Sequence, residues 1–542
     1  MIEVTCVLSF HDSNQNQRMR STPPPFNTLR SKNIEAREDP RLTGAAKPAA
    51  VVTADDLARI GTRVPEFYAG DLFCQFRRTP LYLGQPIALL IFEDFDAFDQ
   101  ARLALRKATV VKYGEETGPV TGPPYAAFRF TRVAGPTPGA PDVYSPVKNG
   151  WVSPGKFQNT ERPIWARLPI PTGLDYAEAA GYGEDIRAEL AANDPAHLVL
   201  ERQFETQSVD PMFLEPESGL AWYDAGRKNL ELVVGVQSPY EAAESVAFLL
   251  GEADAPHKPA RINMQFAYMG GGFGGRDHTP FPLYVALAAM FLPDRPVRLA
   301  HDRYQQFQGG IKRHPFKMRT RIGIDRASGK IFAFAADHEL DGGGLANYSA
   351  SVAAVSATAA LGVYAVPKAD ITTVALHSRG VTAGSMRGYG TLQTMTALEV
   401  LIDEVTTALP MDPIEFRRRN ALGSAGRIIT GNPYIVSVRT PEILDKLEQH
   451  AIWRERAAEK AAEKRREFLS APASLAPPKI MAAGRMLPWG RWRSIQRAGS
   501  QYGSMAPRWA LVLARRSPTG SRPTWATSPT RLRSPNSIRS VH

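Results

Sequence analysis

Short apolar runs and helical spacings of apolar residues predict an α+β protein over most of the chain. Residues 86–92, Pro-Ile-Ala-Leu-Leu-Ile-Phe, form a continuous apolar run that is typical of a strand buried on both faces. Residues 229–236 predict another strand, and residues 262–268 a third. Residues 391–409 carry apolar side chains at helical spacing and predict a long helix. Mixed strands and helices of this kind place the chain in the α+β class.

Changes in local composition predict five segments. Residues 1–47 contain a run of three prolines and a mixed polar stretch, so we expect an irregular segment. Residues 48–118 alternate strand and helix patterns and predict a small α/β domain. Residues 119–179 are rich in Pro and Gly and predict a linker or surface excursion, while 180–469 predict a larger domain. Residues 470–542 form a tail without helical or strand periodicity.

The bulk composition is that of a globular protein. The 542 residues are 43% hydrophobic and 22% charged. We find no apolar window of 18 residues and expect no membrane span; the N-terminus is a poor signal peptide, so the default localisation is cytoplasmic. Two cysteines are too few for a disulfide framework or a cysteine-based metal site within the chain.

The C-terminal tail accounts for the net charge of +11. Residues 471–542 hold eleven Arg and one Lys but no Asp or Glu, which leaves −1 for the rest of the chain. The same tail holds four of the eight Trp, a composition unlike both a disordered segment and a nucleic-acid-binding arm. We interpret the tail as a disordered basic segment or, by preference, an out-of-frame translation, and expect no nucleic-acid partner; a basic nucleic-acid-binding arm is the remaining alternative.

The most distinctive stretch is Met-Gly-Gly-Gly-Phe-Gly-Gly-Arg-Asp at 269–277. Glycines let a ligand approach the backbone, whose N–H groups can hold an anion. Gly270, Gly272 and Gly275 match a dinucleotide fingerprint, but Pro280 and Pro282 prevent a helix from beginning at the loop. A purely structural glycine loop is the remaining alternative from these residues alone.

Three ordered motifs resemble one enzyme family. Residues 269–277 are similar to its glycine motif, 385–393 (Ser-Met-Arg-Gly-Tyr-Gly-Thr-Leu-Gln) to its arginine motif, and 210–216 (Asp-Pro-Met-Phe-Leu-Glu-Pro) to its glutamate–proline segment. The family is that of the molybdenum-binding subunits of xanthine dehydrogenases and aldehyde oxidases. Residues 83–90 resemble its hammerhead α/β domain. The resemblance implies an α+β fold with a hammerhead α/β domain followed by the first part of the molybdenum-cofactor-binding domain.

The resemblance also implies an activity and its partners. The family hydroxylates an aldehyde or an N-heterocycle with oxygen taken from water. The cofactor is a molybdenum–molybdopterin, expected in a dinucleotide form, whose metal is held by the pterin and by no protein side chain. Iron–sulfur (2Fe-2S) and FAD groups are expected on partner subunits.

The resemblance assigns roles to individual residues. Gly271, Gly272, Phe273 and Gly274 are expected against the cofactor. Arg387 is expected to contact the cofactor and to stabilise negative charge that develops during the reaction.

Three further residues receive roles from the same resemblance. Asp277 stands where the family often has a substrate-orienting Glu, and it is shorter by one methylene. Gln207 is expected to bond the molybdenum oxo group. Glu215 is expected to be structural, as are the two histidines, His278 and His314.

One family feature is absent. The general base is a Glu in a Gly-Val-Gly-Glu-like motif near the end of the domain, and no Glu occurs after Leu469. A general base contributes about 10²–10⁴-fold to a rate. The alternative hypothesis is therefore a catalytically inactive, truncated fragment that serves at most as a subunit-interaction module.

Overall fold

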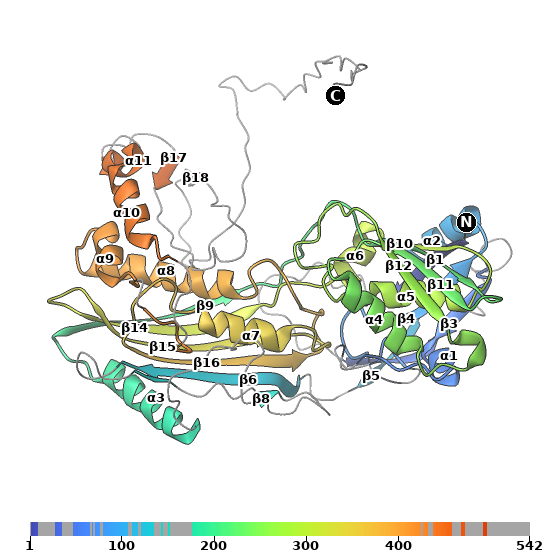
Figure 1. Cartoon of the computed structure of the whole chain (residues 1–542), viewed down its shortest axis with the longest axis horizontal. Helices are drawn as coiled ribbons and strands as arrows, with labels where there is room; N and C mark the ends of the chain where they lie inside the picture. The colour runs from blue at the N-terminus through green and yellow to red at the C-terminus, as the bar shows by residue number, and fades with distance from the viewer. Residues whose placement is uncertain are drawn as a thin grey trace, which may run out of the picture.

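The computed structural model places the chain in two lobes side by side, each built on one sheet (Figure 1). It describes residues 47–65, 68, 71–75, 78, 80–106, 111–116, 121–134, 142–144, 150–151, 176–423, 426–431 and 437–457, together with four short strands at 2–8, 28–34, 468–471 and 492–495.

The first lobe holds a seven-stranded mixed sheet with the order β12-β11-β10-β13-β1-β4-β3. Its strands are β1 (Ile2–Leu8), β3 (Ala50–Thr53), β4 (Pro86–Phe92), β10 (Ser218–Asp224), β11 (Asn229–Val234), β12 (Arg261–Phe266) and β13 (Val297–Ala300). Every residue of β4 is buried, which confirms the strand predicted from the apolar run. The parallel pair β11 and β12 matters for function, because their C-terminal ends meet at one edge of the sheet.

A fully buried helix forms the centre of this lobe. All ten residues of α5 (Phe281–Met290) are buried, and the helix packs against β10 and β13 of the sheet and against α4. A helix that is apolar all round is expected only inside a core. The remaining helices of the lobe are α1 (Ala54–Arg59), α2 (Phe95–Arg106), α4 (Pro239–Leu250) and α6 (Arg303–Gly309), with a 3-10 turn, η6, at Ala255–His257.

The second lobe holds a sheet with the order β7-β6-β16-β15-β14-β9, to which β8 adds by pairing with β6. Its strands are β6 (Thr121–Val133), β7 (Val143–Tyr144), β8 (Gly150–Trp151), β9 (His197–Thr206), β14 (Phe316–Asp325), β15 (Ile331–Asp341) and β16 (Lys368–Ser378). Helices α7 (Ser349–Thr358) and α8 (Thr391–Ala408) cover one face, and α3 (Tyr176–Ala191) covers the other (Figure 1). The predicted helix at 391–409 is thus α8.

Three smaller helices extend the α8 side. They are α9 (Pro413–Asn420), α10 (Thr440–Gln449) and α11 (Ala451–Arg454). Two strand pairs stand apart from the main sheets, namely β2 (Thr28–Ile34) with β5 (Val111–Glu116) and β17 (Phe468–Ala471) with β18 (Trp492–Ile495). Among the described residues, no helix is both long and apolar enough to cross a bilayer.

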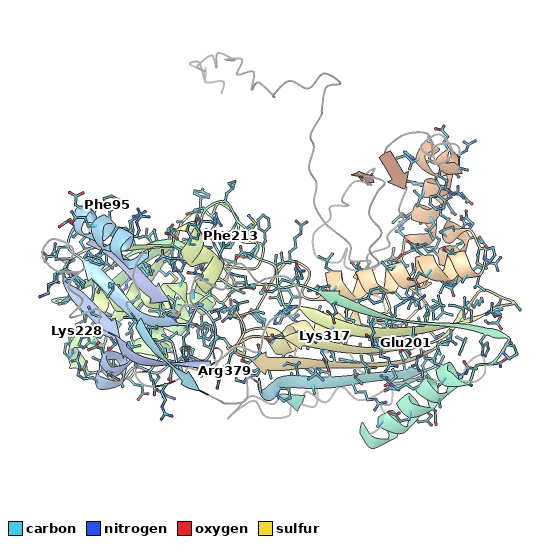
Figure 2. All side chains as sticks on the ribbon, turned by 180° about the vertical axis from the view of Figure 1, so that it is seen from behind. Phe95, Glu201, Phe213, Lys228, Lys317 and Arg379 are labelled. Carbon is cyan, nitrogen blue, oxygen red and sulfur yellow. The ribbon has the colours of Figure 1, made fainter. Side chains whose placement is uncertain are left out.

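The lobes meet through loop-to-loop backbone contacts. The Leu83 N–H donates to the Arg379 carbonyl at 3.1 Å, and the Lys312 N–H donates to the Thr382 carbonyl at 2.9 Å. Figure 2 shows the molecule from behind, with Arg379 at this junction. Glu201 and Lys317 mark the second sheet in the same view.

Two segment predictions are wrong. Residues 1–47 are not irregular throughout, because Ile2–Leu8 forms β1, which lies between β13 and β4, and Thr28–Ile34 forms β2. The alternation of apolar and polar side chains in Ile2–Leu8 is too short to predict a strand by itself, and its pairing with β13 and β4 joins residues far apart in sequence. Moreover β1, β3 and β4 share one sheet with β10–β13, so the boundary predicted before residue 180 does not separate the two sheets.

The predicted linker at 119–179 is also wrong in part, because Thr121–Val133 is β6 and pairs along its length with β16. Its prolines occupy positions 123 and 124, opposite the irregular register between Ala375 and His377. A strand tolerates proline at such a bulge, where a ladder hydrogen bond is already missing. Most of the tail, 472–491 and 496–542, lies outside the described residues.

A buried ion-pair network joins α8 to α9. The Arg417 guanidinium is 1% exposed and donates to Glu399 Oε2 at 2.6 Å and to Asp403 Oδ1 at 2.9 Å. Tyr364 donates its hydroxyl to the other Glu399 oxygen at 2.7 Å.

We predict that Glu399→Ala lowers the free energy of unfolding by about 3–5 kcal/mol, because it removes the buried partner of the Arg417 charge and leaves it only the exposed Asp403 carboxylate. Urea denaturation followed by circular dichroism measures this change. Glu404→Ala is the matched control on the same helix, since Glu404 pairs with the half-exposed Arg202 and such pairs contribute about 0–1 kcal/mol. Equal effects of the two substitutions would contradict the prediction.

Candidate functional site

The glycine loop, residues 269–275, leaves the first sheet at the C-terminal end of β12. The adjacent C-terminal end of β11 leads into Gln237 and then α4. Gln237 Oε1 accepts hydrogen bonds from the Gly274 N–H at 2.8 Å and the Arg276 N–H at 3.3 Å, and the Gln237 N–H donates to the Arg276 carbonyl at 3.0 Å. A Cβ on Gly272 would come within 2.5 Å of Gln237 Oε1. The Gln237 amide therefore sets the shape of the loop, and glycine at 272 leaves room for it.

The buried side chain of Arg276 supports the glycine loop from the interior of the protein. The Arg276 side chain is fully buried, stacks on the Phe213 ring at 4.6 Å, and donates to the Gly235 carbonyl at 3.3 Å and to the Glu215 carbonyl. Glu215 Oε2 accepts from the Gly270 N–H at 2.7 Å and lies 3.7 Å from the guanidinium. Burial lowers the pKa of Arg276, and the nearby carboxylates oppose that shift. These contacts support the structural role predicted for Glu215.

A second loop, 385–390, reaches the glycine loop from the other lobe. The Arg387 N–H donates to the Phe273 carbonyl at 2.8 Å, and the Arg313 guanidinium donates to the Arg387 carbonyl at 2.8 Å. Gly274 has a φ of +94°, and a Cβ there would come within 2.7 Å of Met386 Cα. The structure thus brings together Phe273, Gly274 and Arg387, whereas the sequence places them in motifs more than 100 residues apart.

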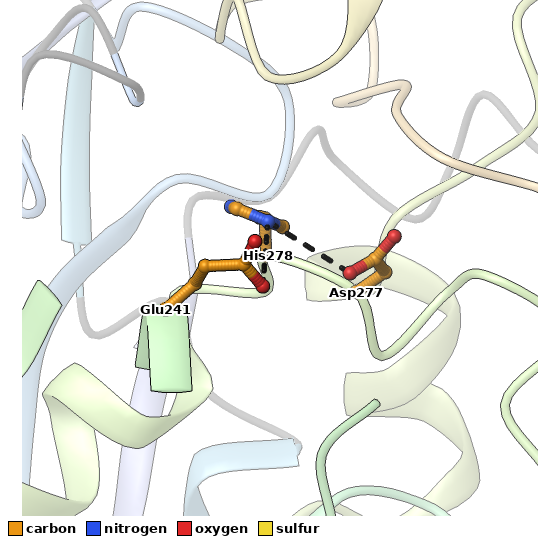
Figure 3. A group of neighbouring side chains, drawn as sticks. All are labelled: Glu241, Asp277 and His278. Atoms are coloured by element: carbon orange, nitrogen blue, oxygen red, sulfur yellow. Dashed lines mark ion pairs between the residues drawn. The ribbon is translucent and has the colours of Figure 1, made fainter. Parts of the chain in front are cut away.

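Residues of both lobes donate hydrogen bonds to the Asp277 carboxylate. Its Oδ1 accepts from the Ser238 hydroxyl, and its Oδ2 accepts from the Tyr389 hydroxyl at 3.2 Å. Burial raises the pKa of Tyr389 to about 12, so this phenol stays a hydrogen-bond donor at neutral pH. His278 follows, with Nε2 3.9 Å from Asp277 Oδ1 (Figure 3). Burial lowers the pKa of His278, and the nearby carboxylates oppose that shift.

The other predicted structural histidine lies in the core. His314 is buried, and its Nε2 is 2.9 Å from the Ser349 hydroxyl. Burial lowers the pKa of His314 to about 3, so the ring is neutral in the folded protein. A neutral, buried and hydrogen-bonded imidazole fits the structural role.

Gln207 is exposed, directly after the end of β9, and its side chain makes no hydrogen bond to the glycine loop among the described residues. Its expected bond to a molybdenum oxo group stays a prediction. Gln237 is the glutamine that contacts this loop, and the motifs did not select it. The sequence does hold a signal for Gln237, because this residue follows a strong strand pattern. The ends of neighbouring parallel strands lie at one edge of a sheet, so the end of this strand is expected beside the glycine loop.

The glycine loop carries an anion-binding feature. The backbone N–H groups of Gly271, Gly272 and Phe273 have no hydrogen-bond partner among the described residues, whereas those of Gly270, Gly274 and Gly275 are bonded. Successive free N–H groups in a loop of alternating handedness form a concave site for an anionic oxygen. The exposed Arg387 stands beside them. These residues therefore fit an anionic, oxygen-rich cofactor such as a metal-bearing pterin phosphate.

Comparison with protein families identifies this region. Residues 176–421 match the family model described as "Molybdopterin cofactor-binding domain". This region belongs to the molybdopterin cofactor-binding family. The family resemblance predicted from the three motifs is confirmed, and so is the general α+β fold, while the hammerhead detail stays a prediction.

Curated relatives that match about half of this chain include dehydrogenase subunits. The chain is 29% identical over 262 residues to the nicotinate dehydrogenase large molybdopterin subunit of Eubacterium barkeri, covering 48% of this chain and 60% of that protein. It is 26% identical over 267 residues to the xanthine dehydrogenase molybdenum-binding subunit of Escherichia coli O157:H7, covering 49% of this chain and 34% of that one. The chain thus spans less than two thirds of these relatives.

Solved structures share the fold at lower identity. The aldehyde oxidoreductase of Desulfovibrio gigas superposes with a TM-score of 0.61 at 20% identity, over 86% of this chain and 45% of that one. The CO dehydrogenase of Oligotropha carboxidovorans superposes with a TM-score of 0.61 at 20% identity, over 86% and 54%.

We predict that Gly274→Ala separates the glycine loop from the 385–390 loop and destabilises the protein by about 1–3 kcal/mol, because an L side chain is strained at this φ and meets the Met386 backbone. Hydrogen exchange at the Arg387 amide, which donates to Phe273, should accelerate.

Gly181→Ala is the control. Gly181 lies in α3, and a Cβ at this position would meet nothing within 4 Å, so alanine there is expected to be neutral or to stabilise by about 0.5–1 kcal/mol. A protected Arg387 amide and unchanged stability in Gly274→Ala would show that the two loops are not closely packed.

Proposed function

We propose that this chain is the molybdopterin-binding part of a xanthine dehydrogenase/aldehyde oxidase-type hydroxylase that oxidises an aldehyde or an N-heterocycle. The observation that carries the proposal is the set of N–H groups at Gly271, Gly272 and Phe273, unpaired within the described part of the chain, on a loop shaped by Gln237 and faced by Arg387. When bound, a molybdenum–pterin cofactor supplies the oxidant and the oxygen derived from water. We expect the dinucleotide form of the pterin.

The chain's own residues would bind the cofactor and orient the substrate. The N–H groups of the glycine loop donate to anionic oxygens, and the Phe273 ring, about half exposed, offers an apolar wall for a planar substrate. The Arg387 guanidinium is permanently charged and stabilises negative charge that develops on the substrate oxygen. Because the Arg387 backbone is bonded to Phe273, the two side chains start from backbone positions at a fixed separation.

Asp277 would select the substrate. Its two oxygens are held in place by Ser238 and Tyr389, so the carboxylate is oriented before any substrate arrives. An oriented carboxylate accepts a hydrogen bond from a ring N–H, which favours N-heterocycles. The similarity to a nicotinate dehydrogenase subunit supports this substrate class.

Electron transfer would require partners. The relative from E. barkeri is a large molybdopterin subunit, which by its name is one of several subunits. We propose an iron–sulfur subunit and an FAD subunit as partners, and a cytoplasmic location. The competing proposal is an inactive module that contacts such partners but holds no cofactor.

Loss of the Gln237 amide is predicted to weaken cofactor binding. In a host that makes molybdopterin, we expect the purified wild-type chain to contain molybdenum by elemental analysis and pterin by fluorescence after oxidative release. Gln237→Ala should lower the molybdenum content about tenfold, because two loop N–H groups lose their acceptor and the loop loses its shape.

Gln207→Ala is the matched control, an exposed glutamine without a hydrogen bond to the loop among the described residues. Loss of molybdenum in Gln207→Ala alone would restore the assignment made from sequence. A folded wild-type chain that contains no molybdenum would support the inactive module.

A further inference from the structure

Three potential metal ligands converge beside the glycine loop. Glu241 lies in the first turn of α4, and Asp277 and His278 follow the loop directly (Figure 3). His278 Nε2 is 3.5 Å from Glu241 Oε2 and 3.9 Å from Asp277 Oδ1, and one ligand atom from each residue lies within 4.8 Å of the other two. The three side chains come from two segments, so sequence spacing gives no sign of this group.

The separations suit a small divalent cation. Metal–ligand bonds of about 2.0–2.2 Å in a tetrahedral site place ligand atoms about 3.3–3.6 Å apart. The 3.5 Å separation already lies in that range. Glu241 is half exposed, so its side chain can move toward Asp277, while the 3.9 Å between His278 Nε2 and Asp277 Oδ1 closes with a small rotation of the Asp277 carboxylate. Asp277 and His278 are mostly buried, so two of the three ligands are held close to their positions in advance.

The charge of the group favours a cation. Neither Asp277 nor Glu241 forms an ion pair with Lys or Arg in the part of the chain that the structure describes, and His278 is the partner of both. Arg276, the nearest basic residue in sequence, points instead toward Glu215 and Gly235. Two carboxylates and a neutral imidazole carry a net charge of −2, and a divalent cation would neutralise it.

The surrounding hydrogen bonds hold the ligands in position. Ser238 and Tyr389 both donate to Asp277, Tyr348 contacts His278 Nε2 through its hydroxyl, and the Asn347 amide donates to the His278 carbonyl at 3.1 Å. Metal ligands are usually oriented by such outer contacts. A cation at Nε2 would replace the Tyr348 hydroxyl or accept it as a further ligand.

We propose that Glu241, Asp277 and His278 form a binding site for a divalent transition-metal cation of the zinc type, separate from the proposed pterin-bound molybdenum. One imidazole and two carboxylates suit Zn²⁺ and its neighbours better than Ca²⁺ or Mg²⁺, which prefer all-oxygen sites. Three protein ligands leave a position open for water or for an anionic group on a substrate. The proposal does not rest on the proposed hydroxylase function, although both use Asp277, and a bound cation would take the place of a substrate N–H at that carboxylate.

Zinc binding to the full chain tests the proposal. The purified protein is treated with EDTA, dialysed against micromolar Zn²⁺, and analysed for bound zinc; Co²⁺ then serves as a spectroscopic probe of ligand type. We expect one equivalent of zinc in the wild type. His278→Gln and Glu241→Gln should each weaken binding about tenfold or more, with loss of the cobalt absorption bands.

His257→Gln is the matched control, because His257 also pairs with a carboxylate, Asp254, at 2.6 Å but belongs to no three-ligand group within the described residues. Zinc affinity should be unchanged in this variant. Absence of stoichiometric zinc, equal affinity in wild type and Glu241→Gln, or equal loss in His257→Gln would each overturn the proposal. Glu241→Gln alters a half-exposed side chain and serves as the decisive variant if His278→Gln does not fold.

Molybdenum content is measured in the same samples. Zinc bound at this site in a chain without molybdenum would support the cation site and contradict the proposed function. Molybdenum bound without zinc would support the proposed function and contradict the cation site. Each proposal can therefore fail without the other.

Discussion

The close backbone approach of two loops from different lobes is the constraint on which the candidate site depends. The Phe273 carbonyl accepts the Arg387 N–H, and Gly274 lies against the Met386 backbone with no room for a side chain. Strain at Phe273 and Tyr389, both with positive φ, is tolerated on either side of this contact. Glycine at 274 is therefore a steric requirement of the interface between lobes, in addition to any role toward a ligand.

The buried Arg276 explains why the glycine loop holds one shape. Glycines make a loop flexible, and such a loop would lose much conformational entropy when it bound a ligand. Here the guanidinium ties Gly235 to the Glu215 backbone, while the Glu215 carboxylate holds the Gly270 N–H. Burying a charge is unfavourable unless it is paired and hydrogen-bonded, and these contacts offset part of that cost, while the Arg276 Nε has no hydrogen-bond partner among the described residues. The loop is thus fixed near its start by Glu215 and near its end by Gln237 and Arg276.

Sequence patterns predicted the elements and the loops of the site well, and their contacts less well. The run at Pro86–Phe92 and the helix at Thr391–Ala408 have strong local signals, and both are present. No local signal shows that Ile2–Leu8 inserts between β13 and β4. Likewise, the family-like segment after Gln207 draws attention to that residue and no motif points to Gln237, whose contact with the glycine loop follows from the parallel pairing of β11 and β12. Sheet partners far apart in sequence are set by tertiary packing, which one sequence does not contain.

Asp277 links the two lobes through a single carboxylate. Ser238, on the first lobe, donates to one oxygen, and Tyr389, from the loop that begins α8, donates to the other. Any movement that parts the lobes must break one of these bonds or turn the carboxylate. A group that binds Asp277, whether a substrate N–H or a cation, therefore also affects the contact between the lobes. By the same coupling, the packing of Gly274 on Met386 affects how tightly that group binds.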